Sequence, residues 1–525
     1  MHSSLNDSGQ RRGSTFWLIF IANLVVDLLA ALNFTAVSTA IPTIVGHLHG
    51  SDFIWVGSAY TVASTAILPT MGGLASTLGR KRILLGFIVL FALGSALCGS
   101  AQSLNMLIAV VQGIGGGGCI SVTEIIYADL IPLPERGKFR LGVCLASHDV
   151  LTFMVSPTSS SSAIGPPIGG ALSASSSWRW LFFLNIPLST PPQEVFRSMI
   201  WTVDWVGLAL LVAGTTTISI ALAWAGFQHS WSSKQVLIPL CMGCSAIGAF
   251  SIFEYKFSVA KIPTIPSFLV TNRTTLSGYI GTGIHGIVSM AAIFYLPVYF
   301  QACKLASPIH SGVDLLGLVC VLPVLSILVG VSVQLLNQYR PQNYVGWVLT
   351  IVGFGLVSRL DKDSTMSAYI GFQVVLAIGL SILWISTQFA VLAPLPFSNN
   401  AHALAFFTFN WGIVFGGTIL QNTLKGRLPS ELLDIFGKNT QLAYWIIPQL
   451  TILPTELRDQ VRDAFGEGLR IIWYSMLAIS ALGLLSCLLM EEVKMRNALD
   501  DTWGIAESPG ARVRSSELGS TASEK

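Results

Sequence analysis

The sequence predicts an all-helical integral membrane protein with about 13–14 transmembrane helices. Of its 525 residues, 52% are hydrophobic and only 10% are charged, and the mean hydropathy is +0.67. Soluble domains carry roughly 25% charged residues, so a water-soluble chain of this length would lack the charges to cover its surface. A bilayer removes that need, because side chains that face lipid are apolar.

The transmembrane helices are expected wherever about 20 mostly apolar residues follow one another. The stretches that meet this length are 16–42, 53–74, 82–101, 106–131, 204–226, 236–254, 276–300, 312–336, 343–359, 367–392, 402–421 and 469–490. The predicted organisation is a cytoplasmic tail (1–15), an N-terminal bundle (16–203), two linker helices (204–254), a C-terminal bundle (255–490) with a long non-cytoplasmic loop (424–468), and a disordered cytoplasmic tail (491–525).

The distribution of Lys and Arg predicts a cytoplasmic N-terminus, because cytoplasmic loops of membrane proteins are enriched in these residues. Basic residues precede the first span and follow the second and fourth spans, whereas the connections 47–52 and 101–105 contain none. Arg359 and Lys362 are the exception, because they fall on the predicted non-cytoplasmic side.

The region 139–203 is irregular. The basic loops require two crossings between Arg140 and Asp204, but the apolar sequence there suffices for about one and a half. One interpretation makes 145–163 an insertion and leaves the sixth span truncated. The other takes 139–155 as the fifth span and 163–188 as the sixth.

The connection after the second predicted span carries a glycine-rich basic motif. It contains Gly72 and the run Gly79-Arg80-Lys81, with Ser76 between them. Gly79 permits a tight turn, and the cations suit the cytoplasmic surface. The motif resembles a loop of the major facilitator superfamily that helps to latch the two halves of the transporter. In that family an acidic residue occupies the position of Ser76, and positive-inside anchoring alone would also explain the cations.

The fourth span supports the same resemblance through Gln112 and Gly113, followed by four further glycines at 115–118. The family usually has an arginine, implicated in proton coupling, three residues before this glutamine, where this chain has Ala109. The glycine run does not match a phosphate-binding loop, and we expect it to permit close helix contact.

A third motif lies in the irregular region. Gly165, Pro166, Gly169 and Gly170 resemble the family's antiporter motif, which is associated with export. Glycine and proline bend membrane helices and allow a neighbouring helix to approach, so a generic kinked helix is the alternative. Asn33 stands where a motif of the first span normally has aspartate.

Together these motifs resemble the 14-span drug:proton antiporter branch found in fungi, over roughly residues 16–490. The resemblance implies two helical bundles around a central cavity and alternating access. It also implies proton-coupled efflux of a drug, toxin or secondary metabolite, with no enzymatic activity and no cofactor. The alternatives are a proton-coupled importer of a nutrient or iron chelate, and a non-transporting receptor on the same scaffold.

Ionisable residues inside the predicted spans are candidates for proton coupling or substrate binding, because placing them in a bilayer costs about 2.5–3.5 kcal/mol on insertion scales. These candidates are Asp27, Glu124 and His285. Asp27 could instead face a wet cavity, Glu124 could pair with Arg136, and His285 could be a hydrogen-bonded residue between helices.

Polar and aromatic residues of later spans could line a substrate cavity, with ordinary helix packing as the alternative. They are Gln388, Asn410 and Trp411. No set of metal ligands is evident, since Cys241 and Cys244 form an isolated C-x-x-C. We expect a monomer in the plasma membrane, or alternatively the vacuolar membrane, that binds a small molecule and protons. The net charge of +3 does not suggest nucleic-acid binding.

Overall fold

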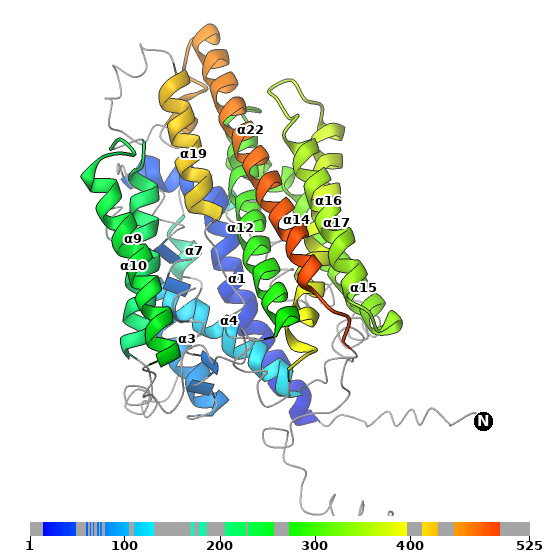
Figure 1. Cartoon of the computed structure of the whole chain (residues 1–525). Helices are drawn as coiled ribbons and strands as arrows, with labels where there is room; N and C mark the ends of the chain where they lie inside the picture. Colours follow the sequence, from blue (N-terminus) through cyan, green and yellow to red (C-terminus); the bar gives the residue numbers. More distant parts are fainter. Residues whose placement is uncertain are drawn as a thin grey trace, which may run out of the picture.

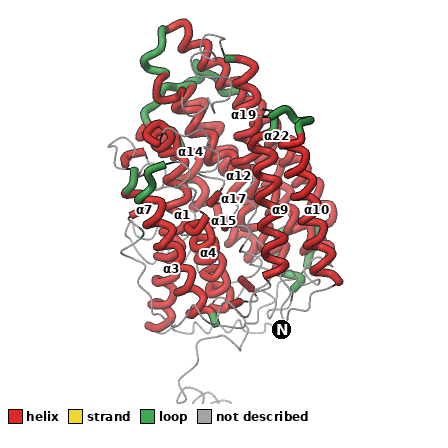
Figure 2. Tube along the Cα trace, turned by 90° about the vertical axis from the view of Figure 1, so that its left-hand side faces the viewer, coloured by secondary structure: helices red, strands yellow, loops and turns green. Residues whose placement is uncertain are grey.

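The computed structural model is a bundle of long helices that run roughly along one axis (Figures 1 and 2). It describes residues 14–48, 59–60, 63–64, 67, 71–72, 74–75, 79–103, 110–130, 168, 170–172, 178–183, 185, 205–226, 229–256, 272–395, 412–428 and 446–493. No β-strand occurs in this part of the chain, where the one bridge joins Ala225 and His229. The predicted all-α class is confirmed.

The N-terminal half comprises α1 (Ser14–Leu48), helical residues between 59 and 75, α3 (Arg80–Gly99), α4 (Val110–Leu130) and the short α7 (Trp180–Phe183). The linker hairpin is α9 (Trp205–Trp224) and α10 (Lys234–Lys256). The C-terminal half contains α12 (Arg273–Ala302), α13 (Pro308–Asp314), α14 (Leu316–Val319), α15 (Val321–Leu336), α16 (Arg340–Val357), α17 (Met366–Leu392), α19 (Gly412–Arg427), η3 (Ile447–Gln449), α22 (Thr455–Ser486) and η4 (Cys487–Leu489).

Helix boundaries follow from local chemistry. The Asn272 side chain accepts hydrogen bonds from the backbone N–H groups of Thr274 and Thr275 at the start of α12. Ser307 caps α13 in the same way by accepting from His310 N, with Pro308 in the first turn. Each cap satisfies backbone donors that have no partner within the helix.

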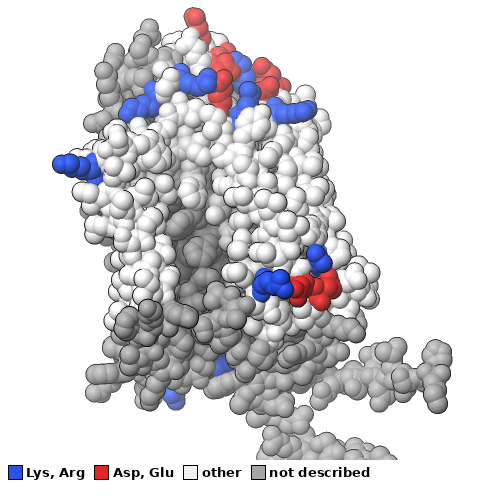
Figure 3. All heavy atoms as spheres, viewed as in Figure 1, with Lys and Arg blue, Asp and Glu red and all other residues white. Residues whose placement is uncertain are grey.

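The surface fits a bilayer. Figure 3 shows Lys, Arg, Asp and Glu gathered at the two ends of the molecule, with a broad uncharged band between them. Six helices in the described ranges are long and apolar enough to cross a membrane. Large apolar side chains such as Leu488, at 67% exposure, and Ile252, at 58%, point outward. Outward apolar groups are favourable where lipid replaces water as the solvent.

Described residues of the irregular region 139–203 make two long-range contacts. Gly170 packs closely against the carbonyl of Pro308, and the Arg179 Nη2 donates to Ala101 O at 2.8 Å. Gly170 therefore lies beside the start of α13, and Arg179 lies beside the end of α3. Most of the region lies outside the described residues, so both interpretations of its spans stay predictions. The predicted truncation of the sixth span concerns residues outside the described ranges.

The end of α9 lies against α19, where the Thr418 hydroxyl donates to Leu222 O at 2.8 Å. α4 and the start of α9 lie at the same end of the bundle (Figure 1). Most of the chain between Leu130 and Trp205 lies outside the described residues, so the two crossings that the basic loops require stay a prediction.

The loop predicted over 424–468 is shorter than expected. Residues 424–427 belong to α19, and α22 already begins at Thr455. The polar segment 455–468 contains six charged residues that would be costly in lipid, so it could not be recognised as part of a spanning helix. In the structure it extends the last helix beyond the apolar band, where Asp463 pairs with Lys362 of the α16–α17 loop and Glu467 pairs with Arg427 at the end of α19.

Candidate functional site

The glycine run of α4 lies against the second helical segment. A Cβ added to Gly113 would lie 2.5 Å from Tyr60 O, and one added to Gly117 would lie 2.6 Å from Ser64 Cα. The Ser64 hydroxyl donates to Gly113 O at 2.9 Å across this contact. The prediction that the run permits close helix contact is confirmed.

The same helix is equally close to α3 on its other side. A Cβ at Gly115 would collide with the backbone of Phe91, and one at Gly118 would collide with the Phe87 ring. Gly94 of α3 has the backbone of Gln112 at the position where its own Cβ would stand. Glycine on both faces lets three helix backbones pack together, as small residues do in membrane bundles.

A network of uncharged polar side chains crosses the interior of the N-terminal half. The Gln112 Nε2 donates to Ser95 Oγ at 2.8 Å, and the Asn185 Nδ2 lies 3.2 Å from both Ser95 Oγ and Asn33 Oδ1. All four residues are at most 2% exposed. The network ties α1, α3 and α4 to the segment after α7, so Gln112 and Asn33 hold helices together. Ser95 was not singled out from the sequence, where it is one serine in an apolar stretch.

Asp27 lies at the contact between α1 and α4. Its side chain is 1% exposed, near the middle of α1. The carboxylate is close enough to Cys119 of α4 for the two groups to interact electrostatically. Glu124 is partly exposed on the same helix, five residues beyond Cys119. The two candidate carboxylates thus lie in the N-terminal half, Asp27 on α1 and Glu124 on α4.

His285 lies in the other half, on α12. Its Nε2 is 3.0 Å from Leu380 O, and its ring meets Trp384 edge-on with 5.6 Å between ring centroids. At 3% exposure it joins α12 to α17. This geometry matches the alternative interpretation of His285 as a hydrogen-bonded residue between helices.

Of the three residues predicted to line a cavity, the structure describes one. Gln388 is partly exposed on α17, one turn beyond Trp384. Asn410 and Trp411 lie outside the described residues, as do Gly165, Pro166 and Gly169. Their proposed roles remain predictions.

The described residues of the basic motif lie at the start of α3, beside the end of α4. Gly79 has φ = 85°, a left-handed conformation that glycine adopts readily, so the predicted tight turn is confirmed. The Arg80 Nε then lies 2.8 Å from Asp129 Oδ2 at the end of α4. Lys81 is exposed, and Gly72 is buried. Ser76, at the family's acidic position, lies outside the described residues.

The two halves touch near the end of α12. The Gln301 Nε2 of α12 lies 3.4 Å from Thr39 O of α1 and 3.3 Å from Ser311 Oγ. Beside this, the contact of Gly170 with Pro308 joins the N-terminal half to the start of α13. We call the contact among α1, α12 and α13 the outer seam. A second apolar cluster also joins the halves, with Met71 and Leu74 on one side and Val333 on the other.

Comparisons with known proteins agree with this architecture. The family model described as Major Facilitator Superfamily matches residues 24–191. The "Efflux pump FUS6" of Gibberella fujikuroi is 32% identical over 97% of this chain and 95% of its own length. The chain belongs to the major facilitator superfamily. It is also 35% identical to the "MFS-type transporter pydD" of Acremonium sp, over 96% of this chain and 91% of that relative.

The major facilitator fold is also found among solved structures. A bacterial homologue of the human lysosomal transporter Spinster, in an inward-facing and occupied conformation, superposes with a TM-score of 0.56 over 90% of this chain and 96% of its own, at 16% identity. Membership of the superfamily makes this chain a multi-pass membrane transporter and confirms the family predicted from its motifs.

Proposed function

We propose that this protein is a proton-coupled exporter of small organic compounds that acts as a monomer in the plasma membrane. The observation that carries the proposal is Asp27, a carboxyl group buried within a spanning helix of a major facilitator fold. An ionisable residue at such a depth is costly and is by default functional. A carboxyl group there can take up a proton in one conformation and release it in the other.

The export direction is supported by two further points. The resemblance of residues 165–170 to the antiporter motif favours efflux. Relatives that match almost the whole chain carry names such as "Efflux pump FUS6" and "MFS efflux transporter aclA", the latter from Aspergillus oryzae and 30% identical over 96% of this chain. Toxins and secondary metabolites are the expected class of compound.

The coupling is tested in proteoliposomes with an imposed pH gradient and a panel of toxins. Asp27→Asn should abolish the dependence of flux on the gradient, and Glu124→Gln should reduce it, while both proteins still reach the membrane. Asp27→Glu, which keeps the acid, should retain part of the coupling, and Asp363→Asn in an exposed loop serves as the control. Gradient-driven flux at the wild-type rate in Asp27→Asn would refute the assignment.

The same proteoliposomes test the direction of transport and whether the protein is a transporter or a receptor. Accumulation of compound on the cytoplasmic side would identify an importer, and binding without flux of any compound would identify a receptor.

A further inference from the structure

One spanning segment of the C-terminal half is interrupted at Asp314. The apolar segment Pro308–Val333 is long enough to cross a membrane, but α13 ends at Asp314 and α14 begins only at Leu316. In a continuous α-helix the carbonyl of Asp314 would accept from the N–H of Leu318. Here the N–H of Leu318 donates to Leu315 O at 2.9 Å instead. The interruption therefore frees the carbonyl of Asp314 for another donor.

Two side chains one turn apart on α17 meet this interruption. The Gln373 Nε2 donates to Asp314 O at 3.0 Å, and the Tyr369 hydroxyl donates to Asp314 Oδ1 at 3.1 Å. The carboxamide carbon of Gln373 also lies 3.5 Å from the position where Gly317 of α14 would carry a Cβ. The packing of α14 against α17 can be followed in Figure 1. Helix α17 thus holds Asp314 through both its backbone and its carboxylate.

The same two side chains could also serve a protonated Asp314. The Gln373 side chain is buried, and its Oε1 has no hydrogen-bond partner among the residues that the structure describes. A buried acceptor without a donor costs free energy. The phenol oxygen of Tyr369 can accept as well as donate. The carboxylate therefore has a donor at this place, and the protonated carboxyl group has acceptors.

The carboxylate of Asp314 is partly exposed and has no salt bridge in the described part of the chain. Two basic residues, Lys304 and His310, are near enough to act on it electrostatically. The Lys304 Nζ is bonded to the backbone oxygens of Lys362 at 2.8 Å and Ser364 at 2.7 Å. His310 lies one turn earlier on α13 and is exposed. An ionised group in a spanning segment without a direct counterion is costly, and uptake of a proton removes that cost.

The short helix α13 also takes part in the contact between the two halves. Ser311 lies one turn before Asp314, and its Oγ is 3.3 Å from the Gln301 Nε2. That amide lies 3.4 Å from Thr39 O of α1 in the outer seam. A change in how α17 holds Asp314 would therefore reach the outer seam through a single turn of helix.

We propose that Asp314 is a second proton-binding site, in the C-terminal half, and that its proton loosens α13 from α17 and thereby changes how readily the outer seam opens. This inference rests on the proposed function, in which Asp27 couples transport to the gradient. As a carboxylate, Asp314 receives a charge-assisted hydrogen bond from Tyr369, which is roughly twice as strong as a neutral one. Protonation removes that charge and weakens the hold on the interrupted segment. The site sets the pH range of transport, and Asp27 supplies the coupling.

The first measurement is proton binding itself, by infrared difference spectra of the full-length protein in lipid. Spectra between about pH 8 and about pH 5 report few ordinary carboxyl groups, because these titrate near pH 4. We expect a carboxylic-acid carbonyl band in the wild type that is missing in Asp314→Asn. Asp363→Asn, at an exposed loop position, is the control and should keep the band. The same band in the wild type and in Asp314→Asn overturns the proposal.

The second measurement is flux of rhodamine 6G in proteoliposomes, with a constant pH difference across the membrane while the absolute pH is varied. Asp314→Asn should lose the dependence of flux on absolute pH and keep its dependence on the gradient. Tyr369→Phe should move the midpoint of the pH profile up by about half to one pH unit, because a bond to the charged form is lost. Tyr344→Phe is the matched control, since the Tyr344 hydroxyl donates to Cys487 O at 3.1 Å, and its midpoint should stay unchanged.

The outcomes separate this site from the proposed function. A wild-type pH profile in Asp314→Asn, or an unmoved midpoint in Tyr369→Phe, overturns the role of Asp314. Loss of the gradient dependence in Asp314→Asn would overturn the division of roles between Asp314 and Asp27. Absence of gradient-driven flux in the wild type counts against the proposed function, and the infrared spectra, which need no transport, then decide whether Asp314 binds a proton.

Discussion

Arg80 and Asp129 are joined by an ion pair, with 2.8 Å between Nε and Oδ2, although 49 residues separate them in sequence. The pair links the start of α3 to the end of α4, and the two side chains are only 12% and 13% exposed. The Arg80 Nη1 also donates to Ala75 O at 2.8 Å, which holds the preceding turn. The basic motif is therefore fixed to its own half by α4.

Loss of this pair is predicted to impair both stability and cycling. Asp129→Asn leaves the nearly buried Arg80 charge without its counterion, and we expect a cost of about 1–3 kcal/mol, below the 3–5 kcal/mol typical of fully buried pairs. The melting temperature in detergent and the transport rate should both fall. The double variant Arg80→Asp with Asp129→Arg should recover part of the loss. Lys81→Gln, at an exposed neighbouring cation, is the control and should change stability little.

The glycine contacts of α4 predict a strong effect of a single methyl group. Gly117→Ala would place a Cβ 2.6 Å from Ser64 Cα, so two helix backbones must move apart. We expect a destabilisation of about 1–3 kcal/mol, the usual cost of overpacking. Size-exclusion chromatography after heating would measure it. Gly283→Ala on α12, where nothing lies within 4 Å, is the matched control, and equal losses in both variants would contradict the packing argument.

The docking of the linker hairpin predicts a dependence on Asn422. Its Nδ2 donates to Ala225 O at 2.8 Å, and Asn422→Leu would leave that carbonyl without this partner. We expect a loss of about 1–3 kcal/mol, seen as a lower melting temperature. Thr423→Val is the control, because the Thr423 hydroxyl bonds only Ile419 O of its own helix. An unchanged melting temperature in Asn422→Leu would mean that the bond from Asn422 to Ala225 O contributes nothing to holding the hairpin.

The loop between α16 and α17 should respond to acid. The Ser364 hydroxyl donates to Asp361 Oδ1 at 2.8 Å and holds the pKa of the Asp361 carboxyl below its ordinary value. A lowered pKa stabilises the folded loop above the unfolded pKa, and this contribution is lost as the pH falls through the folded pKa.

Ser364→Ala should therefore lower the melting temperature slightly at pH 7. The difference from the wild type should shrink as the pH falls through the lowered pKa of Asp361, below which both proteins carry a protonated Asp361. A difference that stays constant over this range would show that the serine acts independently of the carboxylate.

The sequence by itself determined the class of the protein, because apolar runs of about 20 residues and sparse charge are physically tolerable only in lipid. It also determined the close packing of α4 through its glycine run, since this packing depends on residue type and local order. The orientation that Lys and Arg indicate stays a prediction. The resemblance of short motifs was sufficient to recognise the superfamily.

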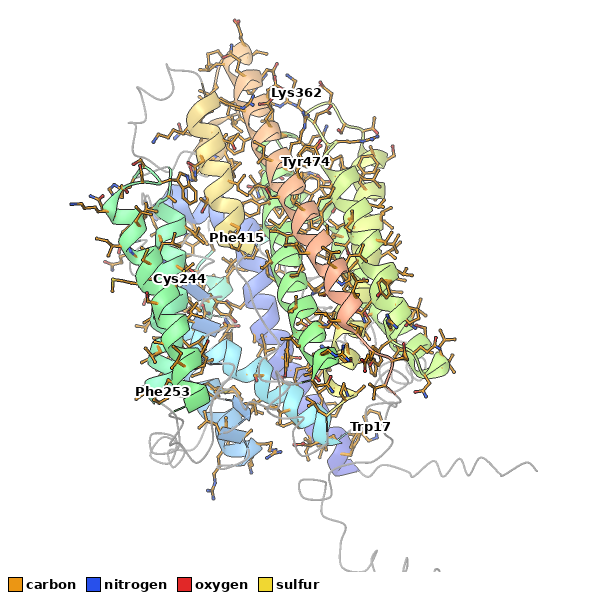
Figure 4. The ribbon with its side chains drawn as sticks, in the orientation of Figure 1. Trp17, Cys244, Phe253, Lys362, Phe415 and Tyr474 are labelled. Carbon is orange, nitrogen blue, oxygen red and sulfur yellow. The ribbon has the colours of Figure 1, made fainter. Side chains whose placement is uncertain are left out.

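Only the tertiary structure decided which distant groups meet. Lys362 appeared on the wrong side of the membrane, but its Nζ lies 2.7 Å from Asp463 Oδ2 of α22, beyond the apolar band (Figure 4). The sequence left His285 open between proton coupling and a hydrogen bond between helices, and the contact of its Nε2 with Leu380 O favours the second. Which groups pair depends on long-range packing between helices, which composition and periodicity do not encode. The partners of Lys362 and His285 could therefore be recognised only in three dimensions.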